Sequence, residues 1–189
     1  QSAIAGQIAD ALIGALPKPA VSTDQFWKLM MALELTENQL DKICAFLVDT
    51  NQAIHGWQNY HLLLLLAYKN YYSTDVVVFC EALIRGSIQK PEVPACFIYL
   101  ASIGKEDSVE SFIDDFKKSW PYQHQRYFLI ALQNSKKEKL KPLVEKMDFR
   151  LKGTIKRLRG TRSLNKTTYI KDFSASSILD IYDELSPYE

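Results

Sequence analysis

The sequence predicts an all-α protein, an α-solenoid-like stack of about four helical hairpins with an extra N-terminal helix and a C-terminal helix. Four segments place apolar residues at i, i+3, i+4 and i+7, which is one face of an α-helix. The segments start 36, 33 and 31 residues apart, a period typical of stacked hairpins. Only 7 Gly and 7 Pro occur, which argues against a turn-rich β fold. The segments are Leu40-Ile43-Cys44-Leu47, Val76-Phe79-Cys80-Leu83, Val109-Phe112-Ile113-Phe116 and Leu140-Leu143-Val144-Met147.

The chain opens with a short predicted helix and a proline linker, which together form a first segment, residues 1–19. Pro17 and Pro19 end this helix, because proline cannot continue a helix and disfavours helical backbone in the residue before it. One side of the helix is apolar, so we expect that side to pack on the following hairpins. It is formed by Ile4, Ile8, Leu12 and Ala15.

The hairpins fill residues 20–149, and each begins with an apolar helix that ends in a small residue. An alanine stands 8 or 9 residues before the start of each of the four segments. A small side chain at this place lets the two helices of a hairpin approach closely. The first helices are expected over Phe26–Leu33, Tyr60–Tyr68, Ala95–Ser102 and Arg126–Leu132, and the alanines are Ala32, Ala67, Ala101 and Ala131.

Capping and turn residues separate the predicted helices. Hydroxyl and acidic side chains precede the second helices, where they satisfy free amide groups and the helix dipole. Glycines stand where helices should end, and prolines stand where the next helices should begin. The starts are marked by Thr36-Glu37, Ser73-Thr74-Asp75 and Glu106-Asp107-Ser108, the ends by Gly86 and Gly104, and the following starts by Pro91, Pro94 and Pro121.

A two-helix unit of 31 to 36 residues resembles the tetratricopeptide and HEAT-like α-solenoid families, over roughly Phe26 to Met147. The resemblance is one of period and helix pairing. Trp57 and Trp120 open helices, but the Leu-Gly of the tetratricopeptide consensus follows neither of them. The resemblance implies a scaffold or binding surface and names no ligand, because fold alone is a weak guide to function.

The strongest functional signal is the basic arm, residues 150–171. From Phe149 to Lys171 there are eight basic residues and no acidic one, a composition that attracts phosphate. We expect the arm to bind RNA or DNA. The alternatives are contact with an acidic partner or the chain's own acidic tail, and a solvated linker without a ligand. The candidate nucleic-acid-binding residues are Arg150, Lys152, Lys156, Arg157, Arg159, Arg162 and Lys166.

The acidic tail, residues 172–189, carries five acidic residues and no basic one. It contains a predicted amphipathic helix that begins near Ser174. Such a helix can dock in a partner's groove. It can equally close the last hairpin as a polar cap, which stacks of this kind need, and we favour the cap. The apolar side of this helix consists of Ile178, Ile181, Tyr182 and Leu185.

A tryptophan followed four residues later by a histidine occurs at two equivalent places in the predicted hairpins. The pairs are Trp57 with His61 and Trp120 with His124. The four side chains could line a protein-binding groove shared by neighbouring hairpins. Alternatively, each tryptophan packs at a helix start and each histidine caps its hairpin, which is the more common arrangement because aromatic residues dominate core burial.

No residue set in the sequence predicts catalysis, so we expect a protein that is not an enzyme. GxSxG, a glycine-rich phosphate loop and HExxH are absent. Asp114 and Asp115 are neighbours that point about 100° apart on a helix, which predicts a solvated face. Cys44, Cys80 and Cys96 lack metal-ligand spacing and are interpreted as small buried hydrophobic residues. We expect no cofactor, no metal and no small-molecule ligand.

The sequence therefore predicts a non-catalytic interaction module of a larger intracellular, cytoplasmic protein, which assists nucleic-acid binding through its basic arm. The alternative is a protein–protein scaffold or adaptor that uses the groove of the first helices. Cysteines without a disulfide pattern suit a reducing compartment. The longest aliphatic run, Leu62 to Ala67, is far shorter than the ~20 residues that span a bilayer, so no membrane partner is expected.

Overall fold

The structure, a computed structural model, is entirely helical in the part of the chain that it describes. That part comprises residues 3–16, 24–49, 56–86 and 90–112, together with His124, Tyr127, Phe128 and Ala131. The predicted all-α class is confirmed there, and none of these residues forms a strand. The helices are α1 (Ala3–Ala15), α2 (Asp24–Ala32), α3 (Glu37–Val48), α4 (Gly56–Tyr68), α5 (Thr74–Gly86), α6 (Val93–Ser102) and α7 (Glu106–Glu110).

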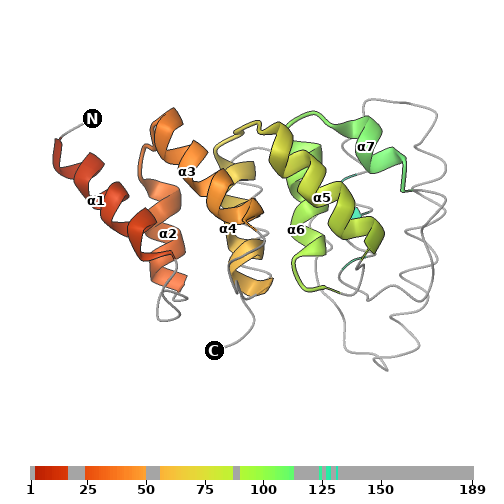
Figure 1. Ribbon diagram of the computed structural model, residues 1–189, viewed down its shortest axis with the longest axis horizontal. Helices are drawn as coiled ribbons and strands as arrows, with labels where there is room; N and C mark the ends of the chain where they lie inside the picture. Colours follow the sequence, from red (N-terminus) through yellow and green to blue (C-terminus); the bar gives the residue numbers. More distant parts are fainter. Residues whose placement is uncertain are drawn as a thin grey trace, which may run out of the picture.

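The helices lie in two rows, as Figure 1 shows. In one row α2 packs on α4 and α4 on α6, so this row consists of the first helices of the predicted hairpins. In the other row α1 packs on α3 and α3 on α5. Contacts of α3 with α4 and of α6 with α5 and α7 join the two rows. The N-terminal helix α1 therefore occupies the row of second helices.

Capping residues set the helix starts where the sequence predicts them. The Thr36 hydroxyl accepts a hydrogen bond from the Gln39 amide at 3.3 Å, and the Gln39 side chain accepts one from the Thr36 amide at 3.0 Å. This reciprocal capping box begins α3. At α5 the Ser73 hydroxyl accepts from the Val76 amide at 3.5 Å. At α6, Pro94 lies in the first turn, where its missing amide hydrogen costs no helical bond.

Two helices end in the same left-handed turn. After α6, Gly104 has a φ of +74°, and the Lys105 amide donates to the Leu100 carbonyl at 2.9 Å. After α4, Asn70 has a φ of +49°, and the Tyr71 amide donates to the Leu66 carbonyl at 3.0 Å. These are Schellman motifs, which satisfy the last carbonyl groups of a helix. Gly104 was expected at a helix end, whereas the role of Asn70 has no counterpart in the sequence prediction.

The repeated apolar pattern forms core as predicted in α3 and in part in α5. All four pattern residues of α3 are buried, from Leu40 to Leu47. In α5 the residues Val77 and Ile84 are buried, whereas the pattern residues Phe79 and Leu83 are only partly so. The buried side of α5 is thus rotated, because α5 packs against both α3 and α6. The pattern continues at Val109 and Phe112, which are buried, and its remaining residues lie outside the described part.

The apolar side predicted for the N-terminal helix is correct only in part, since Leu12 packs against the core whereas Ile4 and Ile8 do not. Ile4 and Ile8 are 68% and 41% exposed, and Ala9 and Leu16 are buried in their place. The reason is the contact of α1 with α3. The Gln39 side chain donates to the Gly6 carbonyl at 3.3 Å and to the Asp10 carboxylate at 3.1 Å, which turns the small-residue side of α1 toward α3.

The aligned alanines differ in burial, and of the three described hairpins only the pair α6 and α7 is among the closely packed helix pairs, so the predicted role of the alanines is not general. Ala67 and Ala131 are buried and Ala101 is half-buried, whereas Ala32 is exposed. The buried residues of α2 are Trp27, Met30 and Met31, spaced at i, i+3 and i+4. Ala32 lies outside this stripe, so it allows no close helix approach in the first hairpin.

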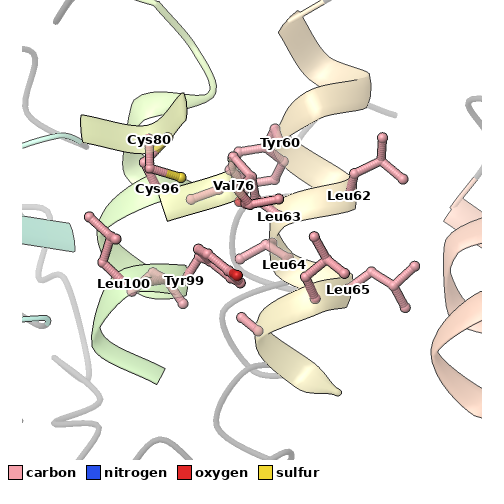
Figure 2. Close-up of a cluster of buried hydrophobic side chains, with 14 of the residues drawn as sticks. Tyr60, Leu62, Leu63, Leu64, Leu65, Val76, Cys80, Cys96, Tyr99 and Leu100 are labelled. Atoms are coloured by element: carbon pink, nitrogen blue, oxygen red, sulfur yellow. The ribbon is translucent and has the colours of Figure 1, made fainter. Parts of the chain in front are cut away.

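The core lies between the two rows, and α4 and α6 are its centre. Figure 2 shows Leu63 and Leu64 of α4 on the side of α6, and Leu62 and Leu65 pointing away from it. All four leucines have no exposed surface. Among the described helices, none combines the length and the apolar character needed to cross a membrane.

Candidate interaction site

The basic arm, the strongest candidate site in the sequence, lies outside the described residues. The same holds for the acidic tail, for Trp120 and for the Trp57 side chain. Of the four predicted protein-binding residues, the structure therefore describes the side chains of His61 and His124 only.

His61 stacks on a tryptophan of the preceding hairpin. Its ring lies 5.0 Å from the Trp27 ring, with 19° between the planes, and 5.3 Å from the Tyr60 ring in an edge-on arrangement. The contact joins α4 to α2, since Trp27 is a fully buried residue of α2. His61 thus packs between two hairpins. This contact is closer to the alternative in which the tryptophan and histidine side chains pack within the fold than to the lining of an exposed groove.

His124 is buried and tied to the turn before α6. It is 5% exposed, and its Nε2 lies 2.9 Å from the Lys90 carbonyl oxygen. A carbonyl only accepts, so Nε2 carries the proton and Nδ1 is left as an acceptor. Burial lowers the pKa of His124 below its ordinary 6.5, which keeps the ring neutral at pH 7.

Four buried polar atoms along the first-helix row lack hydrogen-bond partners in the described part of the chain. We call these side chains the polar row. Their atoms are Nε1 of Trp27 in α2, Oδ1 of Asn59 in α4, Oε2 of Glu92 at the start of α6, and Nδ1 of His124. Each buried polar atom without a hydrogen-bond partner lowers the stability of the fold by about 1–3 kcal/mol, because it loses its contact with water. Polar side chains at such places therefore need an explanation.

Glu92 is the charged member of the polar row. Its side chain is 3% exposed, and it occupies the N-cap position of α6 without capping the helix by a side-chain hydrogen bond. A carboxylate at a helix N-terminus is favoured by the helix dipole, which offsets part of the burial cost. Glu92 stands two residues after Lys90, whose carbonyl accepts the hydrogen bond of His124.

The three cysteines are buried, as the sequence interpretation expects. Burial raises the pKa of the Cys44 thiol to about 11 and raises that of Cys80 as well. Figure 2 shows Cys80 of α5 beside Cys96 of α6. Protonated buried thiols are weak nucleophiles, so these residues act as core packing. Within the described residues no cluster of three or more His, Cys, Asp or Glu side chains could hold a metal ion.

The polar row contains residues that the sequence analysis did not single out. Trp27, Asn59 and Glu92 stand in no motif, and nothing in the sequence marks Trp27 or Asn59 as a buried polar group. One weak signal exists for Glu92, since it is an acid immediately before a helix whose second residue is proline. Asn59 is buried in α4, and sequence spacing does not reveal this burial.

Replacing His124 by glutamine tests its neutral state. Glutamine can still donate to the Lys90 carbonyl but does not titrate. The folded pKa is lowered, so the contribution of neutral His124 to stability is fully present above the unfolded pKa of 6.5 and is lost as pH falls through the folded pKa. The stability advantage of the unaltered chain over His124→Gln should therefore shrink when urea denaturation is measured at acidic rather than at neutral pH. An equal difference at both pH values would show that His124 is not held neutral by the fold.

The comparisons with known proteins give no relative. A scan against models of known families, a search of curated proteins and a search of solved structures each found no match for this chain.

Proposed function

We propose that the chain is a non-catalytic helical-repeat interaction module whose basic arm binds nucleic acid. The repeat part of the proposal rests on the two rows of helices, in which α2, α4 and α6 follow one another and α1, α3 and α5 do the same. A solenoid of four hairpins extends this order by the hairpin predicted from Arg126 to Met147. Stacks of this kind place surfaces for partners more often than they perform chemistry.

One observation carries the nucleic-acid part of the proposal: charge is segregated along the chain. The residues from 3 to 112 that the structure describes include 12 acidic and 6 basic residues, whereas residues 113–171 include 16 basic and 5 acidic ones. Glu37, Asp41 and Asp75 are exposed on the second-helix row. Phosphate is repelled by that surface and attracted by the arm.

Charge reversal in the arm tests this function. The variant carries Arg157→Glu, Arg159→Glu and Arg162→Glu, and the measurement is a fluorescence-anisotropy titration with single-stranded RNA and with duplex DNA. We expect the variant to lose at least about tenfold in affinity at low salt, because three phosphate contacts become repulsive.

A matched control separates arm contacts from net charge. Lys28→Glu, Lys42→Glu and Lys90→Glu change the charge by the same amount at three exposed sites outside the arm. This control should retain most of the binding. Equal losses in the two variants would contradict a site in the arm and would indicate a diffuse charge effect.

The second candidate function is a protein–protein adaptor in which the arm contacts an acidic partner. Exposed apolar side chains near the start of α5 favour it, since Tyr72 and Val78 are both at least half exposed. This adaptor function predicts no RNA or DNA binding even at low salt and unchanged capture of its protein partner by the arm variant.

A further inference from the structure

Two of the three buried cysteines lie beside each other on neighbouring helices. Cys80 of α5 and Cys96 of α6 have no exposed surface, and α5 packs on α6. Figure 2 shows the two side chains together. Burial raises the pKa of the Cys80 thiol, and a hydrogen bond of this thiol with that of Cys96 raises it further. The two sulfur atoms therefore interact directly, although the residues stand 16 positions apart in the sequence.

The third cysteine, Cys44, has different neighbours. It lies on α3 and is 6% exposed. Burial raises the pKa of its thiol most, and the other groups that shift this pKa belong to Ser73, Asp41 and Asp75. No second thiol is among them. The part of the chain that the structure describes thus contains one thiol pair, Cys80 with Cys96, and one separate thiol.

The thiol pair lies between two hairpins. α5 ends the hairpin that begins with α4, and α6 begins the next one. A bond between the two sulfur atoms would fix α5 on α6 and close a loop of 17 residues, from position 80 to position 96. Cysteines on separated backbones cannot be joined without backbone movement, whereas thiols that already interact meet this requirement.

We propose that the thiol pair is a site of reversible oxidation, at which hydrogen peroxide converts Cys80 and Cys96 into a disulfide that joins α5 to α6. One thiolate attacks an oxygen of the peroxide and becomes a sulfenic acid, while the other oxygen leaves and takes up a proton to give water. The second thiol attacks the sulfenic sulfur, the S–S bond forms, and the hydroxyl group leaves with the thiol proton as a second water. Two electrons pass from the sulfur atoms to the peroxide. Dithiothreitol reverses the step by thiol–disulfide exchange.

Burial controls the rate of this oxidation. In the closed fold both thiols are protonated and out of reach of solvent, so they only pack and react slowly. The opposite side of α5 faces solvent, since Val78 and Arg85 are exposed, and local opening of α5 brings the thiols to water. Once one sulfur is oxidised, its partner is already close. The disulfide therefore forms faster than a second peroxide oxidises the sulfenic acid.

Peptide mapping of the full chain tests the site. The chain is treated with hydrogen peroxide in native buffer, free thiols are alkylated after unfolding, and the peptides are analysed by mass spectrometry without a reductant. We expect Cys80 linked to Cys96, Cys44 alkylated, and both linked residues recovered as thiols after dithiothreitol. Links that involve Cys44, oxidation of Cys80 and Cys96 without a link between them, or recovery of both as alkylated thiols would overturn the proposal.

Two matched variants separate the pair from general oxidation. Cys44→Ala keeps the pair and should form the link to the same extent as the unaltered chain. Cys96→Ala removes one partner, so Cys80 should take up oxygen as a sulfenic or sulfinic acid and form no intrachain disulfide. An intrachain disulfide of equal yield in Cys96→Ala would show that Cys80 pairs with Cys44 and would contradict the assigned pair.

Urea denaturation reports whether the bond fits the native fold. The linked chain should unfold at a urea concentration about 1–2 M higher than the reduced chain, because the closed loop restricts the unfolded state. The same shift is expected in Cys44→Ala, and no shift is expected in Cys96→Ala. An unchanged or lower midpoint of the linked chain would contradict a bond that joins α5 to α6 in their native positions.

Discussion

Replacing Phe97 by alanine is expected to lower the free energy of unfolding by about 3–5 kcal/mol. Phe97 lies in the middle of α6 with no exposed surface. Its ring centroid is 5.0 Å from that of Phe128 and 6.2 Å from that of Phe112, so it joins α6 to Phe128 and to Phe112, two residues beyond α7. Alanine removes these aromatic contacts and leaves a cavity that rigid helices cannot close.

The loss is large compared with the total stability of a domain, which is about 5–15 kcal/mol. Urea denaturation followed by circular dichroism at 222 nm, the helical band, measures it. The matched control is Val78→Ala, since the Val78 side chain is 60% exposed and should change the free energy by no more than about 0.5 kcal/mol. A loss below about 1 kcal/mol for Phe97→Ala would mean that α6 is not the centre of the core.

The second large effect is expected at Lys69, which ties two hairpins together. Its ammonium group donates to the carbonyl oxygens of Met31 and Leu33, both at 2.6 Å. These carbonyls lie at the end of α2, where they have no partner within the helix and where a positive charge suits the dipole. The ammonium is partly withdrawn from water, and this burial lowers the pKa of Lys69.

Lys69→Met should reduce the free energy of unfolding by about 2–3 kcal/mol, because two charge-assisted hydrogen bonds are lost while the aliphatic stem is kept. The measurement is again urea denaturation. Lys42→Met serves as the control, since Lys42 is exposed on α3. Equal, small effects of both substitutions would show that the Lys69 contacts are not formed in solution.

Local sequence signals predicted most of the helix boundaries. The capping box at Thr36, the proline in the first turn of α6 and the left-handed Gly104 are each specified by a few neighbouring residues. Asn70 adopts positive φ at the end of α4, as Gly104 does at the end of α6. An asparagine in the sequence is a weaker signal of a helix end than a glycine. Asparagine tolerates positive φ but also occurs in many other conformations, so spacing alone did not reveal it.

Tertiary contacts decided what the local signals could not. The exposed Ile4 and Ile8 belong to a regular apolar pattern, but the polar contact of Gln39 with α1 turns another side inward. The rotation of α5 has the same origin, since two packing partners share its surface. Helical periodicity defines a stripe, whereas the neighbours decide which edge of the stripe is buried.

The candidate site was less predictable than the fold. The sequence identified His61 and His124 as related, and the structure gives them different surroundings: a tryptophan stack for His61 and a backbone carbonyl for His124. Trp27 reaches His61 from a segment distant in sequence, and so does the Lys90 carbonyl with His124. The basic arm stays a prediction from composition alone. Composition can predict its attraction for phosphate, because charge acts at long range and needs no particular fold.

The salt dependence of nucleic-acid affinity tests the central claim most directly. Anisotropy titrations of the full chain with duplex DNA at a series of salt concentrations give the slope of log affinity against log salt. Our account predicts binding at low salt and a steep negative slope, about −0.9 for each phosphate contacted, that becomes shallower in the variant with glutamate at positions 157, 159 and 162. Absence of binding at low salt, or the same slope in both proteins, would contradict it.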